Sequence, residues 1–430
     1  MKIRLPMHPR LKGWFQLYTF LAKCRWAIFV GVAALVLGII VAMMWPVGSR
    51  IWLILNGMIL VISLILVVRD WRDIARRETD LYIVNVQPRT ILSRIQMSDA
   101  YSCWQLIEFH EQYAIYSDEV NKLLCTTKLD TKIVRDKYHI SEPVRTLAPF
   151  ILRTEFQRGA AIFNSSKVRL MTDIIKETFT KHLPVSLQET DYFSSICTNE
   201  MSWKQVISRS RGTVILDGLT LISNKRILYD YAESPCSNHI GMGTLAFTLD
   251  GKMITSIQTY ESAQSPGFMM PSGTGSADWS DLTPGISLQD FVTRAMEREL
   301  LEECGLRGRP VPVVTEIVGF VRHVNRGYKP DFFGVSLIGV SSNELRIAKE
   351  ERWFIADIIA TKVTKATAEE LGDALEQFRE THEPTFSIVL YLNLCFLLSR
   401  LKEDKNLFVK LSKALQSRNP NTKLGSSNMR

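Results

Sequence analysis

Two long apolar runs stand near the start of the sequence. Residues 26–45 form a run of 20 without a charged side chain, and residues 51–68 form a second run of 18. Helices of these lengths would measure about 27 to 30 Å, close to the hydrocarbon thickness of a bilayer. Because only five residues join the two runs, the pattern predicts an N-terminal transmembrane α-hairpin with spans at 26–45 and 51–68.

After the apolar runs, the chain alternates between β-prone segments and segments of helical periodicity. This alternation predicts an α/β architecture, with strands at 213–216, 219–222, 243–249, 253–259, 311–321 and 332–340 and helices at 367–380 and 385–401. Residues 386–398 are almost wholly apolar, but 13 residues are few for a membrane span, so a buried core helix is the better interpretation. Helical character is also expected at 105–125 and 168–180.

The pattern divides the chain into four parts. They are the hairpin with its basic flanks (1–77), a mostly helical linker or extension of unknown role (78–210), an α/β domain (211–405) and a polar tail (406–430).

Basic residues flank the predicted hairpin on one side. Residues 1–77 carry 11 Lys and Arg against two Asp, and only Arg50 lies between the spans. The positive-inside rule then predicts a multi-pass inner-membrane protein with both termini in the cytoplasm. A cleaved signal peptide is the competing interpretation, although its apolar part would be shorter. The whole chain has a net charge of +8, so its positive charge resides in 1–77, which predicts contact with a lipid bilayer and no general nucleic-acid binding.

Acidic residues cluster in the run 298–306, Arg-Glu-Leu-Leu-Glu-Glu-Cys-Gly-Leu. On a helix, Glu299, Glu302 and Glu303 project from one face within about one turn, and like charges so close repel. A hard divalent cation would remove this repulsion and share itself with substrate phosphates. The alternative is a solvated helix face that ends at a left-handed cap.

The run reads R-E-U-x-E-E-x-G-U, with U an apolar residue, and it resembles the second half of the Nudix box. The resemblance implies a Nudix-like α/β/α sandwich around a mixed sheet, with Arg298, Glu302 and Glu303 in catalytic roles. It also implies Mg²⁺ (or Mn²⁺) held by Glu299, Glu302 and Glu303. The segment Pro271-Ser272-Gly273 resembles the turn of the family whose backbone carbonyl helps to hold the metal, so Ser272 and Gly273 become candidate cofactor-binding residues.

The flanks of this run depart from the family pattern. Pro284 stands where the box usually opens with Gly, and Asp290 stands at a position usually held by Glu. Ser287 and Asp290 also form a capping box, so a cap and a metal-site role are both open for Asp290. Between Gly273 and Arg298 the spacing exceeds that of the family, and the turn-forming residues 274–281 predict a loop beside the site. A general base would come from the Glu cluster or from a later loop, where Glu350 and Glu351 are candidates by position.

Two functions follow from these resemblances. One is a constitutive membrane-tethered pyrophosphohydrolase of nucleoside diphosphates linked to X. The other follows from the whole-chain architecture, which resembles the two-transmembrane Nudix effectors of cyclic-oligonucleotide anti-phage signalling (CBASS). That resemblance implies a nucleotide or cyclic oligonucleotide ligand, a homo-oligomer formed through the transmembrane hairpin, membrane disruption and a cognate nucleotidyltransferase encoded nearby. The intact glutamates favour the first function, and the predicted spans favour the second.

Overall fold

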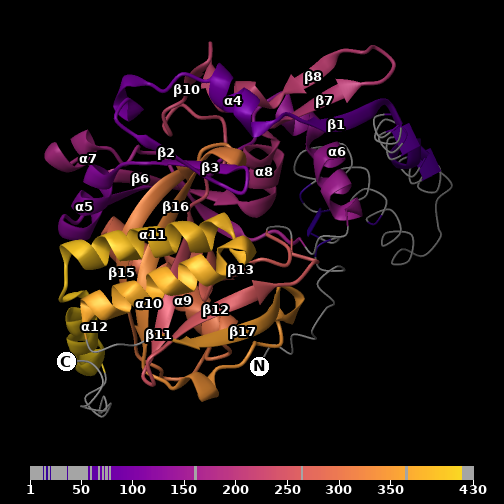
Figure 1. The fold of residues 1–430 in the computed structure, drawn as a ribbon. Coiled ribbons are helices and arrows are strands. Elements are labelled where there is room, and N and C mark those ends of the chain that lie inside the picture. Colours follow the sequence, from indigo (N-terminus) through magenta and orange to yellow (C-terminus); the bar gives the residue numbers. More distant parts are fainter. Residues whose placement is uncertain are drawn as a thin grey trace. The chain divides into compact units, whose positions relative to one another are not determined.

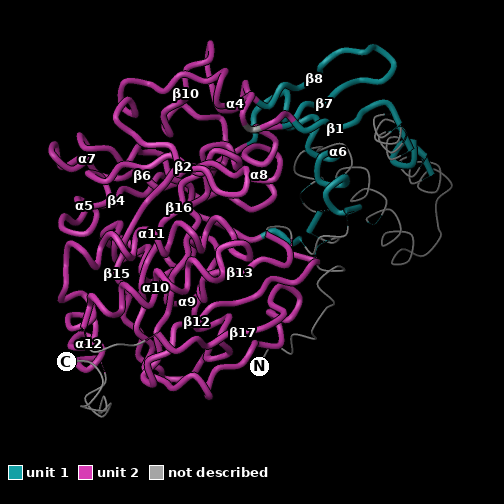
Figure 2. Tube along the Cα trace, viewed as in Figure 1, with its two compact units in different colours: residues 1–85, 140–164, 204–218 teal, residues 86–139, 165–203, 219–430 magenta. Residues whose placement is uncertain are grey.

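The computed structural model describes residues 79–158, 162–262, 265–363 and 367–418, together with scattered helical residues before position 79. Its contacts divide the chain into two compact units (Figure 2). Unit 1 comprises Met1–Asn85, Ile140–Asn164 and Lys204–Gly218, and unit 2 comprises Val86–His139, Ser165–Trp203 and Leu219–Arg430. The four-part division expected from the sequence stays a prediction.

The predicted transmembrane hairpin is wrong. In the part of the chain that the structure describes, no helix is both long enough and apolar enough to cross a membrane. Of the two expected spans, 26–45 lies outside the described residues except at position 36, and 51–68 is described only at 57, 58, 61–65 and 68. The prediction rested on hydropathy alone, and apolar composition does not by itself distinguish a membrane span from other apolar segments. The inner-membrane location was derived from these spans and is wrong with them, whereas the homo-oligomer stays a prediction.

The described residues of unit 1 include a small antiparallel sheet and the helix α6. Its strands follow the order β1-β7-β8, namely β1 (Leu81–Asn85), β7 (Lys204–Ser208) and β8 (Val214–Asp217). The strand expected at 213–216 corresponds to β8. Helix α6 (Val144–Gln157) buries a continuous apolar side that includes Leu147 and Ile151.

The main sheet of unit 2 is mixed, as expected for the α/β part of the prediction (Figure 1). Within the described residues it has nine strands in the order β13-β12-β11-β16-β15-β3-β2, with β14 on β11 and β17 on β12. The pair β11 and β16 runs parallel, and the other pairs run antiparallel. The strands are β2 (Gln105–Phe109), β3 (Gln112–Tyr116), β11 (Gly241–Thr248), β12 (Lys252–Gln258), β13 (Met269–Pro271), β14 (Gly273–Ser276), β15 (Val313–His323), β16 (Lys329–Ile338) and β17 (Ile355–Lys362).

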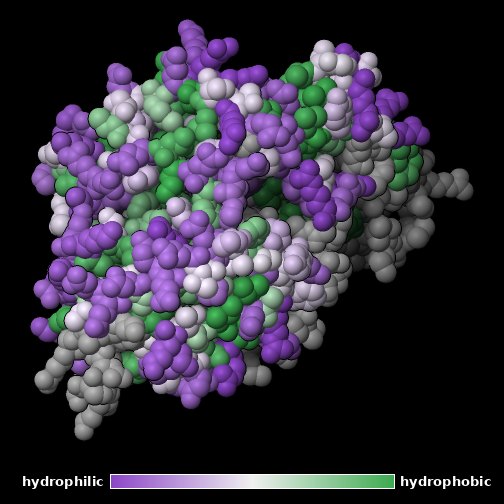
Figure 3. All heavy atoms as spheres, in the orientation of Figure 1, coloured by the Kyte–Doolittle hydropathy of each residue, from purple (hydrophilic) through white to green (hydrophobic). Residues whose placement is uncertain are grey.

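Helices cover both faces of this sheet. On one face, α9 (Leu288–Glu303) packs its apolar side against strand residues such as Ile317 and Phe332, beside α5 (Asp118–Thr126). On the other face, α10 (Ala368–His382), α11 (Ile388–Glu403) and α12 (Leu407–Arg418) pack against residues such as Phe333 and Val335. The core-helix interpretation of 386–398 is confirmed, since α11 buries residues on most of its circumference. Hydrophilic side chains predominate over the outer surface of α10 and α11 in Figure 3.

Several predictions for the region before the main strands are wrong. Residues 78–210 were expected to be mostly helical, and their described part contains the strands β1–β7 together with the helices α4–α8. The segment 105–125 forms the β2–β3 hairpin before α5, and 168–180 forms the end of a strand and a short helix. The remaining elements here are α4 (Pro88–Arg94), β4 (Thr131–Val134), β5 (Ser166–Leu170), α7 (Lys176–Thr180), β6 (Val185–Asp191) and α8 (Tyr192–Cys197).

Two shorter segments also differ from the prediction. The strand expected at 219–222 is instead a 3-10 turn, Gly218–Leu221. The tail expected from 406 begins with α12, which buries Leu407, Leu411 and Leu415, while residues 419–430 lie outside the described part.

Candidate functional site

Helix α9 carries the acidic run in its last turn, and its first turn decides the role of Asp290. The Ser287 hydroxyl accepts a hydrogen bond from the Asp290 amide (3.1 Å) and donates one to the Asp290 carboxylate (2.7 Å). Lys128 donates to the same carboxylate at 2.8 Å, and this contact lowers the pKa of Asp290. Ser287 is the N-cap of the helix, and Asp290 lies in the first turn, about 20 Å from Glu303 along the helix axis. Asp290 therefore does not join the other acids.

Glu303 is buried, with 6% of its surface exposed. One carboxylate oxygen accepts a hydrogen bond from the Thr274 amide (3.3 Å), and the other has no partner among the described residues. Burial, followed by the charges of Glu299 and Glu351, raises the pKa of Glu303 well above its ordinary value. A buried carboxylate with an unpartnered oxygen is unfavourable as a free charge, so either a proton or a bound cation must neutralise it.

Glu299 lies one turn before Glu303 on the same helix face. Its side chain is 16% exposed and receives a contact of 3.1 Å from Arg298. Burial raises the pKa of Glu299 to about 7, although the charges of Arg298 and Lys167 act in the opposite direction. A Cβ atom at Gly275 would lie 2.5 Å from this carboxylate, so strand β14 forms one wall of the site only because residue 275 has no side chain.

Glu302 has both oxygens engaged. Arg298 contacts one oxygen at 3.1 Å, and Arg307 contacts the other at 3.2 Å. Arg298 is therefore positioned to orient the Glu302 carboxylate.

Arg298 lies at the centre of a larger network than the run itself suggested. It donates to both oxygens of Asp281 (2.8 and 3.0 Å) and to the Ser276 carbonyl (3.3 Å), and Asp278 lies 3.6 Å away. Burial alone would lower the pKa of Arg298, but the charge of Glu299, followed by Asp281 and Asp278, raises it. The insertion was predicted as a loop, yet it forms β14 and the 3-10 helix Trp279–Asp281, and it supplies most partners of Arg298.

Sequence reasoning assigned no role to Asp278 and Asp281. One signal was available, because their i, i+3 spacing forms a capping box inside the insertion, with the Asp281 carboxylate accepting from the Asp278 amide at 2.9 Å. No comparable signal pointed to Lys167, which comes from β5.

Ser272 and Gly273 connect the insertion to the sheet. The Ser272 hydroxyl accepts from the Ala246 amide (2.9 Å) and donates to the Thr244 carbonyl (3.3 Å), so it is committed to β11. A Cβ atom at Gly273 would lie 3.0 Å from that of Leu300, which shows how closely β14 approaches α9. Their assignment as cofactor-binding residues stays a prediction.

Glu351 lies close to the cluster, at the start of the 3-10 helix Glu351–Trp353. Burial and then the charge of Glu302 raise the pKa of Glu351, and the charge of Glu351 in turn contributes to the raised pKa of Glu303. Glu350, the other candidate base, is exposed.

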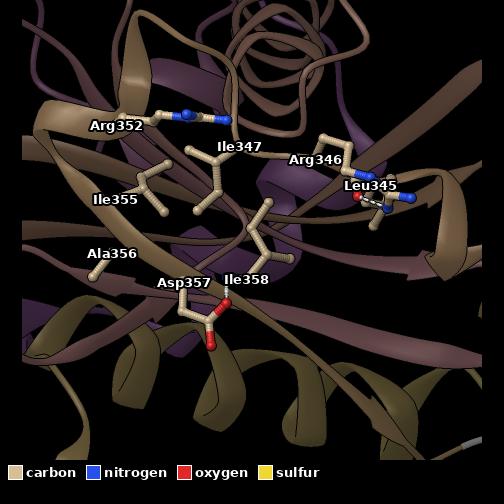
Figure 4. A pocket seen from close by; sticks show the side chains of 8 residues that line it. All are labelled: Leu345, Arg346, Ile347, Arg352, Ile355, Ala356, Asp357 and Ile358. Atoms are coloured by element: carbon tan, nitrogen blue, oxygen red, sulfur yellow. Dashed lines mark hydrogen bonds between the residues drawn. The ribbon is translucent and has the colours of Figure 1, made fainter.

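A cavity of about 490 Å³ opens beside the end of the acidic helix (Figure 4). The Arg346 amide donates to the Cys304 carbonyl at 3.1 Å, which joins the cavity wall to the residue after α9. Aliphatic side chains lie between Arg352 and Asp357, and the lining residues are Leu345, Arg346, Ile347, Arg352, Ile355, Ala356, Asp357 and Ile358.

The site is better suited to hold a divalent ion with two carboxylates than with three. In the described part of the chain, no group of three or more His, Cys, Asp or Glu side chains is arranged to hold a metal ion. Mg²⁺ commonly binds through one or two carboxylates and completes its shell with water and substrate phosphate. The unpartnered oxygen of Glu303 and the neighbouring carboxylate of Glu299 supply such a pair. The three-glutamate ligand set stays a prediction.

Comparisons with known proteins add little to this geometry. No family model matches the chain, and no curated protein matches it. Among solved structures, the chain is similar to the MutT protein from Methanosarcina mazei Go1, with 16% identity and a TM-score of 0.25. The match covers 39% of this chain and 96% of that one. Because a TM-score this low carries no argument, the functional case depends on the residues of the site.

Proposed function

We propose that the chain is a Nudix-type hydrolase that cleaves the phosphoanhydride bond of a nucleoside diphosphate linked to a second group, with Mg²⁺ or Mn²⁺ as cofactor. One observation carries the proposal. Glu303 is buried with one oxygen unpartnered, one turn from Glu299, in a run that matches the second half of the Nudix box.

Each residue of the site has a role in this proposal. Glu299 and Glu303 would hold the ion, with Glu302 as a further acidic group. When bound, the ion neutralises phosphate charge and lowers the pKa of its water. Arg298 orients Glu299 and Glu302 through its two 3.1 Å contacts. Glu351, whose charge acts on Glu303, is the general base in this proposal and removes the proton from the attacking water.

A second candidate is recognition of a nucleotide without hydrolysis. It is favoured by Glu302, because both of its oxygens are held by arginines and are less available to a metal. In this case the ligand is a nucleotide or a cyclic oligonucleotide, as the anti-phage resemblance implies, and a cognate nucleotidyltransferase supplies it.

The test uses the full chain with Mg²⁺ and a panel of nucleotide-diphosphate sugars, dinucleoside polyphosphates and cyclic oligonucleotides. Products are separated by ion-exchange chromatography, and binding is measured by calorimetry. We expect hydrolysis of a linear diphosphate, and we expect Glu303→Gln to reduce it by about 100-fold or more without lowering the melting temperature much. The matched control is Glu297→Gln, because Glu297 lies on the same helix but pairs with Arg418 at 3.0 Å.

Two results separate the candidates. Binding of a nucleotide without turnover would reject the hydrolase and favour recognition. Full turnover in Glu303→Gln would reject the assigned site.

A further inference from the structure

Lys167 lies next to the acidic network although it comes from β5, far from the acidic run in sequence. Its ammonium group donates to the Asp278 carboxylate at 2.6 Å and to the Ser276 carbonyl at 3.4 Å. The side chain is only 12% exposed, so this contact is sheltered from water. An ion pair of this kind is held more firmly than an exposed one, whose contribution is commonly small.

Backbone contacts fix the same junction. Lys167 and Asp278 form an antiparallel bridge, and the Val168 amide donates to the Ala277 carbonyl at 3.1 Å. The Ile240 carbonyl accepts from the Ala277 amide (3.0 Å), and the Ile240 amide donates to the Val168 carbonyl (2.9 Å). These hydrogen bonds place the insertion between β5 and the start of β11. The position of Lys167 is therefore set by the backbone as well as by its charge.

Asp278 lies between two cations. One of its oxygens receives Lys167 at 2.6 Å, and the other lies 3.6 Å from Arg298. Arg298 has in addition the carboxylates of Asp281, Glu299 and Glu302 as partners. Removal of Lys167 would leave Asp278 without its closest cation, and Asp278 would then compete with Glu299 and Glu302 for Arg298.

We propose that Lys167 is a positioning residue of the site, which holds Asp278 so that Arg298 stays directed at Glu299 and Glu302. The inference deepens the proposed function and rests on it, since Arg298 orients Glu299, an assigned metal ligand, and Glu302, the further acidic group of the site. It gives the β5 segment, which lies outside the acidic run and its flanks, a role in the chemistry.

The test compares four variants of the full chain at one fixed pH. They are Lys167→Met, Lys167→Arg, Asp278→Asn and the double variant Lys167→Met with Asp278→Asn. Mn²⁺ alone is the probe, with free ion measured by electron paramagnetic resonance, and kcat and KM are measured on whichever substrate the wild type hydrolyses. Residues that orient metal ligands typically affect affinity or rate by about 10- to 100-fold, so Lys167→Met should weaken Mn²⁺ binding by about 10-fold and lower kcat more than it raises KM.

Charge rescue distinguishes positioning from packing. Lys167→Arg should retain binding within about 3-fold of the wild type, because it preserves the cation beside Asp278. The double variant should recover much of the loss, because it removes the carboxylate that competes for Arg298. The control is Lys137→Met, which removes an ion pair to Glu189 at 2.8 Å from a mostly exposed lysine.

The outcomes are separable. Wild-type Mn²⁺ affinity in Lys167→Met, or no recovery in both Lys167→Arg and the double variant, overturns the inference and leaves the hydrolase proposal intact. A wild-type chain that neither binds Mn²⁺ nor hydrolyses any substrate overturns both. A lowered melting temperature with unchanged Mn²⁺ affinity shows that Lys167 only stabilises the fold, which also rejects the inference.

Discussion

Arg298 and Asp281 form a two-point ion pair that ties the inserted segment to the last turns of α9. The guanidinium donates from Nε to Oδ1 at 2.8 Å and from Nη2 to Oδ2 at 3.0 Å. The Asp281 side chain is 6% exposed and that of Arg298 is 21% exposed, so both groups are largely withdrawn from water. This leaves the remaining guanidinium nitrogen, Nη1, to contact Glu299 and Glu302. The insertion therefore determines where the arginine of the acidic run points.

Asp281→Asn should impair the site without unfolding the protein. The amide keeps the size of the carboxylate but cannot accept two charge-assisted hydrogen bonds from Arg298, which would then shift toward the other acids. We expect turnover to fall by about 10- to 100-fold, as for other residues that orient ligands, and stability to fall by about 1 to 3 kcal/mol. Steady-state kinetics and urea unfolding measure the two effects. Asp373→Asn, an exposed position on α10, is the control, and equal turnover in the two variants would contradict the assigned role.

Gly275→Ala should displace the Glu299 carboxylate. The added methyl group would lie 2.5 Å from the carboxylate carbon and from one of its oxygens, so that side chain has to move. Because the obstacle is the end of a flexible side chain and not backbone, we expect a loss of stability below about 1 kcal/mol together with at least about a 10-fold loss of Mn²⁺ affinity. Equilibrium dialysis against Mn²⁺ measures the second quantity.

Gly372→Ala is the matched control for that substitution. Gly372 lies within α10, and a Cβ atom there meets nothing within 4 Å. An alanine at a helix position with open space around its Cβ should stabilise the protein by about 0.5 to 1 kcal/mol and leave Mn²⁺ binding unchanged. An equal loss of Mn²⁺ affinity in both variants would mean that the clash with Glu299 is not the cause.

Arg322→Lys should destabilise unit 2 strongly. The Arg322 side chain is 2% exposed, its guanidinium lies 4.1 Å from the centre of the Tyr231 ring and 4.6 Å from that of Tyr101, and it pairs with Asp173 at 3.4 Å. A lysine keeps the charge but not the planar group that stacks on rings and donates in several directions. Because the charge is kept and the hydrogen bonds and ring stacking are lost, we expect a cost of about 1 to 3 kcal/mol, which urea unfolding can measure. Arg309→Lys, at an exposed pair with Glu344, should change stability by well under 1 kcal/mol.

Sequence periodicity predicted only part of the main sheet. The strands β11, β12, β15 and β16 are apolar or alternate, and the β11–β12 turn carries an ordinary signal, Gly251 with φ +73°. The strands β13, β14 and β17 were not predicted, and β14 has the turn-forming composition of a loop. The β2–β3 turn has no such signal, because His110 and Glu111 adopt φ values of +47° and +59° that usually require Gly or Asn. The hairpin was therefore predicted as helix.

The acidic run placed Glu299, Glu302 and Glu303 on one helix face, because that depends only on helical spacing. The partners that fix their geometry could not be found in the same way. Asp281 is 17 residues from Arg298, and Lys167 is 111 residues from Asp278, so both contacts depend on the tertiary fold. The spans expected at 26–45 and 51–68 rested on apolar composition, which does not by itself establish a membrane span.

Acid should destabilise the protein through His323, the last residue of β15. This side chain is 4% exposed, and neither ring nitrogen has a hydrogen-bond partner among the described residues. Burial lowers the pKa of His323 to about 4, and Arg326 and Lys329 act in the same direction against Asp331. In the unfolded chain the pKa is about 6.5, so between these two values the unfolded state binds more protons. The contribution of His323 to stability is therefore complete above about pH 6.5 and is lost as the pH falls toward about 4, by at most about 1.4 kcal/mol per pH unit.

Urea unfolding across this range should show the slope, and His323→Asn should reduce it, whereas His110→Asn at an exposed position should not. An unchanged slope in His323→Asn would assign the acid sensitivity to other buried groups.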